Sequence, residues 1–424
     1  MRMLWIVVLD LLVLGQLGTS ACASVGSAEP FEIQVDRTSM ASVQAAIDAC
    51  PSSNAARTRG CYIRLPAGTI RGHWRIGGDS GDTLKVGVCL LGQGPGLGNT
   101  WPDGKPGASG TTLVYDGPPG GTLLEFAGGD YPCMRDVTLA MDGAAVGVRF
   151  SAGRAPIQNA MLERVTIAGN GGPSAGTGLL ITGATKNDQV DALLAQELRI
   201  DNVDVGIEVD SHQAVMNRIG PGSKISARSA AVRIRGGSLS LDGAMAQCTT
   251  ASCCTYDLLP GHGYLRVRDG YHEIGLPAPN IKLLCLSRGS PEGVGGWHMV
   301  SFVESYFNVQ CDASKGPCSV DLVNGRSNVG VVFRDNWIVS TLPVAEYSRR
   351  VFANVVFSTP AGGQVPARLV WQNNFVSSGM GGIRATIGPG TRIEALTSDG
   401  KRIWNDTNLD GRWDPSEPSM AGGP

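Results

Sequence analysis

The chain has 424 residues, of which 59 are glycine and only 17% are charged. This composition excludes a helical bundle, which would be rich in Ala, Glu, Lys and Leu, and it fits short strands joined by many tight turns. The formal net charge is −2 and no basic cluster stands out, so we expect no nucleic-acid binding. Local basic residues can still contact an acidic polymer, so near-neutrality does not exclude an anionic glycan as a partner.

The N-terminus has the pattern of a secretory signal peptide. Arg2 precedes an apolar run from Leu4 to Leu17, and small residues surround Cys22. We therefore predict a signal peptide over residues 1–23 and a secreted protein. Asp10 interrupts the apolar run, which leaves a buried N-terminal element as an alternative, and a lipid on Cys22 would instead anchor the protein at the cell surface. No other apolar run is long enough to span a membrane, so we expect no stable membrane insertion after signal removal.

The remaining cysteines support export. Removing Cys22 from the 11 cysteines leaves an even number, and short spacings between cysteines in an exported chain predict disulfides that close loops. A zinc site is the alternative, because Cys and His at close spacing also suit that metal. The disulfide groups are Cys50 with Cys61, Cys248 near Cys253 and Cys254, and Cys311 with Cys318, and the zinc set would be Cys248, Cys253, Cys254 and His262.

A short amphipathic helix is predicted over residues 42–50. Its apolar residues are Val43, Ala46 and Ile47, Ser42 can cap its N-terminus, and a proline follows it. A strand interrupted by Pro-Ala-Gly follows at residues 61–69.

These segments carry a family resemblance. The segments "SVQAAIDAC" (42–50), "CYIRLPAGT" (61–69), "VCLLGQGPG" (88–96) and "TTLVYDG" (111–117) resemble the N-terminal part of the pectate-lyase superfamily. The resemblance implies an all-β, single-stranded right-handed parallel β-helix, a solenoid whose N-terminal helix caps the open end. It is close over about the first eighty residues and extends in style to 385, so the β-helix domain is predicted over 31–385. The Gly-Ala-x-Gly-Asp-Gly-x-x-Asp-Asp segment of many relatives is absent, and Phe31 to Arg37 stand there instead.

A repeat in the chain predicts stacked coils independently of the resemblance. Short runs that alternate apolar and other residues end in a small or polar residue, as stacked parallel strands require. Between Ile200 and Phe302 we expect two or three coils that carry a long disulfide-stapled insertion. Aligned on their last inward residue, the runs give Ile167, Ile200, Phe302, Phe333 and Trp371, and two positions earlier Val165, Leu198, Val300, Val331 and Leu369.

The turn position of this alignment supplies the candidate catalytic residues. If Phe302 and Phe333 lie on adjacent coils, Glu304 and Asp335 lie one strand spacing apart, and paired carboxylates can perform acid/base catalysis as in glycosidases. In the lyases of the superfamily, carboxylates instead hold calcium against an anionic sugar while an arginine abstracts a proton. A structural ladder of Asn, Asp and Ser in the turns is the other interpretation. The catalytic candidates are Asp201, Glu304, Arg334 and Asp335.

The C-terminal tail, residues 386–424, contains an EF-hand-like calcium loop. The sequence from Asp406 matches Asp-x-Asn-x-Asp-Gly with a glutamate at the twelfth position, in which oxygen ligands at alternate positions surround a hard cation. Prolines in the flanks disfavour a helix pair, and a solvated acidic tail is the alternative. The predicted metal ligands are Asp406, Asn408, Asp410, Arg412 through its carbonyl, Asp414 and Glu417.

Two functions fit this scaffold. The first is a polysaccharide-active enzyme, a lyase or hydrolase of an acidic, uronate-type glycan, working as a monomer. The second is a non-catalytic surface adhesin or glycan-binding protein. An enzyme should bring the candidate carboxylates and arginine into one groove, whereas a binding protein should expose aromatic residues such as Trp297, Tyr306 and Trp337.

The calcium loop is tested by calorimetry. We expect weak binding of calcium to the wild-type protein, with a dissociation constant of about 10⁻⁴–10⁻³ M, and loss of the binding heat in Asp410→Ala. Ser416→Ala, within the loop but at a position that supplies no ligand, should bind like the wild type. Equal heats in the wild type and Asp410→Ala would exclude the site.

Overall fold

The computed structural model describes residues 31–36, 38–52, 60–78, 84–94, 110–153, 155–172, 175–185, 188–250, 253–261, 263–274, 280–286, 299–309, 318–327, 330–340, 351–358, 368–376, 383–387 and 392–396. The predicted signal peptide and the calcium loop lie outside these residues. Among the described residues, no helix has the length and apolar composition needed to cross a membrane.

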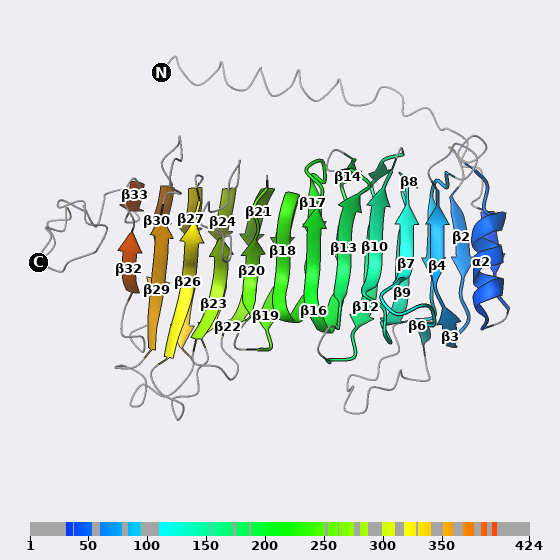
Figure 1. The fold of residues 1–424 in the computed structure, drawn as a ribbon, viewed down its shortest axis with the longest axis horizontal. Helices are drawn as coiled ribbons and strands as arrows, with labels where there is room; N and C mark the ends of the chain where they lie inside the picture. Colours follow the sequence, from blue (N-terminus) through cyan, green and yellow to red (C-terminus); the bar gives the residue numbers. More distant parts are fainter. Residues whose placement is uncertain are drawn as a thin grey trace, which may run out of the picture.

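The helix α2 (Met40–Ala49) lies at one end of the stack, as predicted (Figure 1). Its buried residues are Val43, Ala46 and Ile47, which confirms the predicted apolar face. The N-cap is Ser39 rather than Ser42, because the backbone N–H of Ser42 donates to the Ser39 hydroxyl at 3.2 Å.

The rest of the described chain winds through parallel strands that form three faces. Each strand pairs with the equivalent strand of the next coil. The described chain is nearly all β, as predicted (Figure 1). Face 1 contains β1 (Phe31–Gln34), β2 (Cys61–Arg64), β5 (Val88–Leu91), β15 (Leu194–Gln196), β17 (Asn217–Ile219), β21 (Gly263–Arg268), β24 (Met299–Val303), β27 (Gly330–Arg334), β30 (Arg368–Gln372) and β33 (Arg392–Leu396). Face 2 contains β3 (Gly68–Gly72), β6 (Thr111–Tyr115), β19 (Met245–Cys248), β22 (Tyr271–Ile274), β25 (Tyr306–Val309), β28 (Trp337–Ser340) and β31 (Phe375–Val376).

Face 3 and the strands that bend between faces complete each coil. Face 3 contains β4 (Trp74–Gly77), β7 (Thr122–Ala127), β10 (Val146–Ala152), β13 (Thr177–Gly183), β20 (Cys254–Leu258), β23 (Asn280–Leu286), β26 (Cys318–Arg326), β29 (Val351–Ser358) and β32 (Ile383–Ile387). Four long strands bend: β9 (Cys133–Ala140) and β12 (Met161–Ala168) run from face 1 to face 2, β16 (Arg199–Asp210) from face 2 to face 3, and β18 (Lys224–Asp242) through faces 2, 3 and 1. A separate three-stranded sheet joins β8 (Gly129–Asp130), β11 (Ile157–Gln158) and β14 (Val190–Asp191).

The core is a set of side-chain stacks inside the coils. Phe302 and Phe333 lie on adjacent coils, as predicted, with ring centroids 4.8 Å apart, and Trp371 continues the stack at 5.3 Å. Burying each such side chain stabilises the fold by about 1.5–3 kcal/mol, so repetition of one inward position along the chain supplies most of the driving force.

Disulfides link neighbouring segments in the part of the chain that the structure describes. The predicted Cys50–Cys61 pair is confirmed, and Cys248 pairs with Cys253. Cross-coil bonds Cys89–Cys133 and Cys254–Cys285 were not predicted, because their partners are 44 and 31 residues apart in sequence. These bonds leave the predicted zinc set without free thiolates, and they fit a compartment that oxidises thiols.

Two expectations about the coils are wrong. The cysteine-rich segment is no long insertion: Cys248 and Cys253 close a short turn and Cys254 begins the buried strand β20. The stack also continues past 385, because β33 pairs with β30 as far as Leu396. The prediction of an insertion was wrong because closely spaced cysteines are typical of a disulfide-closed loop, whereas Cys248 and Cys254 lie in strands.

A buried histidine lies within the aromatic core. His272 is fully buried, stacks on Phe307 at 5.0 Å, and lies 3.3 Å through Nδ1 from the Tyr256 hydroxyl. Burial lowers the pKa of His272 from 6.5 to about 4, and a backbone hydrogen bond at Ala246 offsets this only in part. The folded protein therefore holds the imidazole neutral.

Stability should reflect this histidine as the pH falls. The unfolded chain protonates His272 near pH 6.5 and the folded chain only near 4, so its contribution is complete above 6.5 and is lost between those values. We expect the wild type to lose roughly 3 kcal/mol more free energy of unfolding than His272→Phe across this range, measured by denaturant titration. His73→Phe, which changes an exposed histidine, should follow the wild type. Parallel profiles for the wild type and His272→Phe would contradict the assignment.

Candidate functional site

One outward row of face 2 runs the length of the stack. In-register pairing places successive side chains of this row above one another at the strand spacing of about 4.8 Å. The row begins with four threonines and ends with four aromatic residues. Its members are Thr69, Thr112, Thr138, Thr166, Arg199, Lys224, Met245, Tyr271, Tyr306, Trp337 and Phe375.

The four aromatic residues, Tyr271, Tyr306, Trp337 and Phe375, form a surface that we call the aromatic ladder. The rings of Tyr271 and Tyr306 stack at 5.4 Å with an interplanar angle of 6°, and those of Trp337 and Phe375 lie 5.0 Å apart. Trp337 is 55% exposed and Phe375 49% exposed. Large aromatic side chains that are exposed or partly exposed in consecutive coils form a continuous apolar platform, a feature that in proteins often marks a binding surface.

Charged turn residues border the aromatic ladder. Glu304 and Asp335 each occupy the turn between faces 1 and 2, with φ of 52° and 56°, two residues before Tyr306 and Trp337. They lie on adjacent coils, as predicted, since the Glu304 N–H donates to the Arg334 carbonyl at 3.0 Å. Nε of Arg268 lies 3.4 Å from Oε2 of Glu304 in the next coil, and Nε of Arg334 lies 3.5 Å from Oδ2 of Asp335, its neighbour in the sequence. These side chains are about half exposed and can contact a ligand on the ladder.

The structural ladder predicted as the alternative also exists, one residue further on. The buried Asn336 side chain accepts from the Ser305 backbone N–H at 2.9 Å and donates to the Phe302 carbonyl at 3.0 Å. Asn374 repeats this in the next coil, accepting from the Asn336 N–H. The turn therefore satisfies its backbone with Ser305, Asn336 and Asn374, which leaves Glu304 and Asp335 free of that role.

In earlier coils, the residues at the same turn position are paired with each other. Asp136 and Arg164 both have positive φ there, and Arg164 binds both oxygens of Asp136, at 2.6 and 2.9 Å. These hydrogen bonds from Arg164 lower the pKa of Asp136. A bidentate pair of this kind is structural. The longer contacts at Glu304 and Asp335 distinguish the turns beside the aromatic ladder.

The predicted repeat alignment merged two different faces. Ile167 and Ile200 pair on face 2, whereas Phe302 and Phe333 pair on face 1. Asp201 consequently lies apart from the other three candidates. Asp201 and Glu304 are four coils apart, as the successive face 1 pairings β15–β17–β18–β21–β24 show. At the strand spacing this is about 19 Å along the stack. Asp201 is also ion-paired with Arg199.

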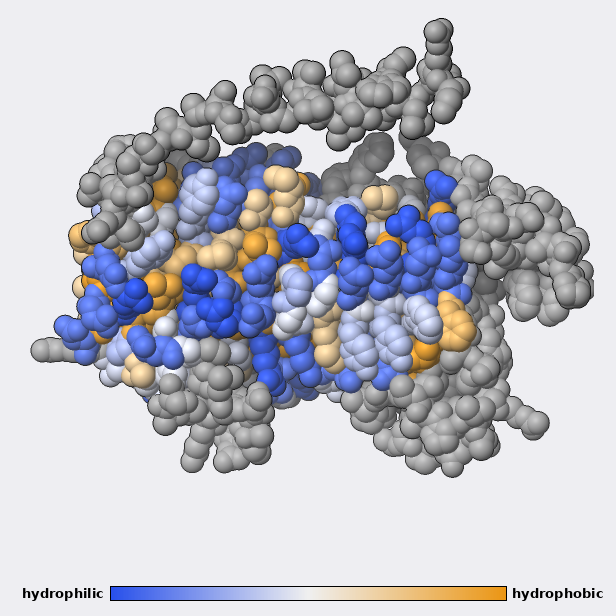
Figure 2. Space-filling view, turned by 180° about the vertical axis from the view of Figure 1, so that it is seen from behind, coloured by the Kyte–Doolittle hydropathy of each residue, from blue (hydrophilic) through white to orange (hydrophobic). Residues whose placement is uncertain are grey.

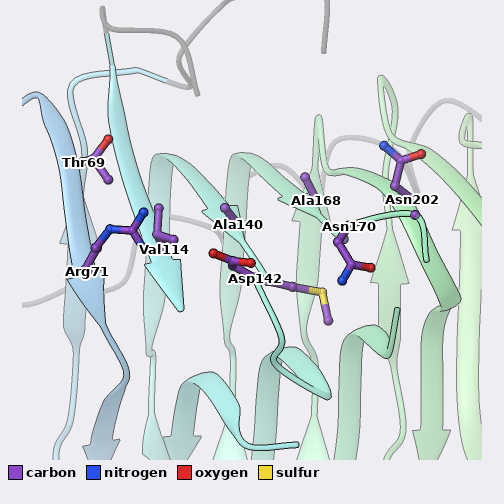
Figure 3. Close-up of a pocket in the computed structure, with 11 residues that line it drawn as sticks. Thr69, Arg71, Val114, Ala140, Asp142, Ala168, Asn170 and Asn202 are labelled. Atoms are coloured by element: carbon purple, nitrogen blue, oxygen red, sulfur yellow. The ribbon is translucent and has the colours of Figure 1, made fainter. Parts of the chain in front are cut away.

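A groove occupies the other end of face 2. A pocket of about 500 Å³ is lined there by Arg71, Asp142, small side chains and turn residues (Figure 3). Its floor follows the row of Arg71, Val114, Ala140 and Ala168, and Asp201, the next residue of this row, is not among the lining residues. Viewed from behind the face shown in Figure 1, the molecule carries hydrophilic and apolar side chains in bands along the stack (Figure 2). One face thus offers a groove at one end and a platform at the other.

Sequence reasoning missed two of the four residues of the aromatic ladder, Tyr271 and Phe375, and it missed the groove. Tyr306 and Trp337 were named as exposed aromatics, and the spacing from Tyr271 to Phe375 carries the repeat that would have completed the set. Trp297 and the calcium-loop residues Asp406, Asn408, Asp410, Arg412, Asp414 and Glu417 lie outside the described residues. No group of three His, Cys, Asp or Glu side chains suited to a metal was found among the described residues.

No protein-family model matches the chain, and no curated protein matches its sequence. Solved structures are similar. An alginate lyase from Paenibacillus sp. str. FPU-7 is 13% identical, covering 86% of this chain and 99% of that chain, with a TM-score of 0.43. DFA-IIIase from Arthrobacter chlorophenolicus A6, without its lid and in complex with GF2, is 12% identical, covering 87% and 95%, with a TM-score of 0.48. PfbA, a surface adhesin of Streptococcus pneumoniae, is 12% identical, covering 87% and 92%, with a TM-score of 0.44.

These neighbours have right-handed β-helix folds of the pectate-lyase type, the architecture that the N-terminal segments of this chain resemble. All three scores lie below 0.5, and the likenesses assign neither an activity nor a ligand to this chain.

Proposed function

We propose that this protein binds an extended polysaccharide along face 2, with the aromatic ladder as the main contact surface. The observation that carries the proposal is the run of four outward aromatic residues in consecutive coils, Tyr271, Tyr306, Trp337 and Phe375. A sugar ring has an apolar face of C–H groups that packs on an aromatic ring, and a polymer repeats that face at regular intervals. A row of rings at a fixed spacing suits such a ligand better than it suits a compact one.

The charged border supplies the polar contacts in this proposal. Glu304 and Asp335 accept hydrogen bonds from sugar hydroxyls, and Arg268 and Arg334 donate to ring or carboxylate oxygens. Asp269, which also pairs with Arg268, brings the border to three carboxylates and two guanidinium groups. An anionic, uronate-type glycan therefore needs a cation here, and in the lyases of the pectate-lyase superfamily that cation is calcium held by carboxylates. The calcium loop expected in the C-terminal tail is a separate site.

In this proposal the protein is a secreted monomer, and its coils form a right-handed solenoid. Connections between parallel strands of one sheet are right-handed in nearly all proteins, which supports the handedness. Disulfides in several coils support export, with a lipid anchor at Cys22 as the cell-surface alternative. An adhesin would use the same surface as a soluble glycan-binding protein does.

Truncation of the ladder tests the binding function. We expect Trp337→Ala to weaken binding of a glycan, selected from a panel of neutral and uronate polysaccharides, about tenfold, or roughly 1.4 kcal/mol, by isothermal titration calorimetry. Tyr62→Ala removes a partly exposed aromatic on face 1 and should leave the affinity unchanged. If both variants bind every glycan as the wild type does, the ladder is not the binding surface.

An enzyme on the same site is the second candidate. The observation that favours it is the adjacency of Glu304 and Asp335, at about the strand spacing of 4.8 Å, close to the carboxyl separation of retaining glycosidases. Arg334 beside them could abstract a proton in a lyase. Asp201 lies too far away to join this reaction, and it is ion-paired with Arg199.

Product analysis tests the enzyme. The wild-type protein is incubated with the same panel, with and without calcium. Absorbance of unsaturated products would identify a lyase, and new reducing ends without that absorbance a hydrolase. Activity at this site should fall at least a hundredfold in Glu304→Gln, as expected for loss of an acid/base group, and persist in Asp269→Asn. Absence of products across the whole panel would exclude catalysis and leave the binding function.

A further inference from the structure

The groove at the N-terminal end of face 2 has a chemistry that differs from that of the aromatic ladder. Arg71 lies at one end of its floor, and its guanidinium has no carboxylate partner among the described residues (Figure 3). This contrasts with Arg64, Arg75 and Arg135, each of which has a carboxylate partner on its own face. An exposed guanidinium in a pocket presents several N–H donors to an anionic group.

The floor and wall of the groove supply contacts for a polyhydroxylated ligand. Val114, Ala140 and Ala168 are small, so the floor is recessed and apolar. Asp142 and Asn202 line the wall, and neither side chain has a partner in the described part of the chain. Acceptors and amide donors above an apolar floor match the hydroxyl groups and the C–H face of a sugar.

A buried hydroxyl beside the groove is also unpaired. Thr112 is 1% exposed, and its Oγ1 has no hydrogen-bond partner among the described residues. It lies on the same side of β6 as Val114, which lines the groove, and pairs with Thr69, another lining residue. A buried polar group without a partner is costly, and because Thr112 does not line the pocket it is an unsatisfied neighbour of the groove and not itself a ligand contact.

The charges along the groove are ordered. Arg71 on β3 and Asp142 after β9 are two pairing steps apart, about 10 Å along the stack. An anionic group on Arg71 is therefore removed from the Asp142 carboxylate, while the rest of the ligand reaches Asp142. The groove offers a single cation among its lining residues, which suits a ligand with isolated charges better than a polyphosphate backbone.

We propose that this groove is a second glycan-binding site, which takes a sugar unit carrying a carboxylate or sulfate, with the anionic group on Arg71 and neighbouring hydroxyls on Asp142 and Asn202. It rests on the proposed function only for the class of ligand, because the two surfaces are separate. From β16 to β22 the pairings pass through β18 and β19, three steps, or about 14 Å. The acidic border of the aromatic ladder disfavours an anionic sugar. In this proposal the groove at the other end of face 2 binds it instead.

Binding of short oligomers to the full-length protein tests the site. The probes are oligogalacturonate, its neutral galactose counterpart of equal length, and a sulfated galactose oligomer, all too short to reach the ladder, in calcium-free buffer. We expect Arg71→Gln to weaken oligogalacturonate binding roughly tenfold or more by calorimetry, since a charge-assisted contact is lost. Ala140→Leu, which fills the floor, should weaken both acidic probes, and Arg75→Gln, on face 3, should leave them unchanged.

The outcomes separate the two sites. Retained oligogalacturonate binding in Trp337→Ala together with its loss in Arg71→Gln supports the groove, even if the ladder binds nothing. Tighter binding of the sulfated than of the carboxylated probe identifies sulfate as the anionic group. Equal affinity of the wild type and Arg71→Gln for both acidic probes, or no binding of either to the wild type, overturns the proposal and leaves the ladder untouched.

Discussion

Parallel backbone pairing in register is the constraint on which every functional feature of this protein depends. Once β22, β25 and β28 pair without a register shift, the outward position of one coil must lie above that of the next. A one-residue slip would turn Tyr306 inward and Phe307 outward, so the buried phenylalanines hold the exposed aromatics in line. The core stacks and the aromatic ladder are thus two sides of the same hydrogen-bonded sheet.

In the turn between faces 1 and 2, two successive residues have different roles. The first, Glu304, has a left-handed backbone conformation with φ of 52° and faces solvent, and the second, Ser305, faces the interior. Asp335 and Asn336 repeat the division one coil later. Because Ser305 and Asn336 meet the backbone hydrogen-bonding requirement, the outward residues are free to vary in charge. The structural ladder predicted for this turn is therefore present at Ser305 and Asn336, and the outward positions Glu304 and Asp335 stay candidates for a site.

The sequence was sufficient for the architecture because inward positions repeat as apolar residues, and Phe302 and Phe333 were correctly placed on adjacent coils. It was insufficient to assign each strand to its face. Inward residues on any face are equally apolar, so Ile200 could be aligned with Phe302 although they lie on different faces. That ambiguity grouped Asp201 with the wrong turn. Arg71 could not be recognised as a candidate, since the groove that it lines is formed with small side chains from other coils, far from it in the sequence.

The two ends of face 2 differ in the size and chemistry of their outward side chains. The row that carries Tyr306 and Trp337 near one end carries Thr138 and Thr166 near the other, and beside these threonines the neighbouring row carries Ala140 and Ala168. Small residues let the flanking turns rise above the sheet and form a groove, whereas large rings fill that space and form a platform. Under the two proposals, a long glycan that follows the stack would meet a recess with polar walls and then an apolar ridge. A glycan chain long enough to contact both would bind with an effective concentration set by the scaffold between them, so two modest sites on one face could together give tight binding.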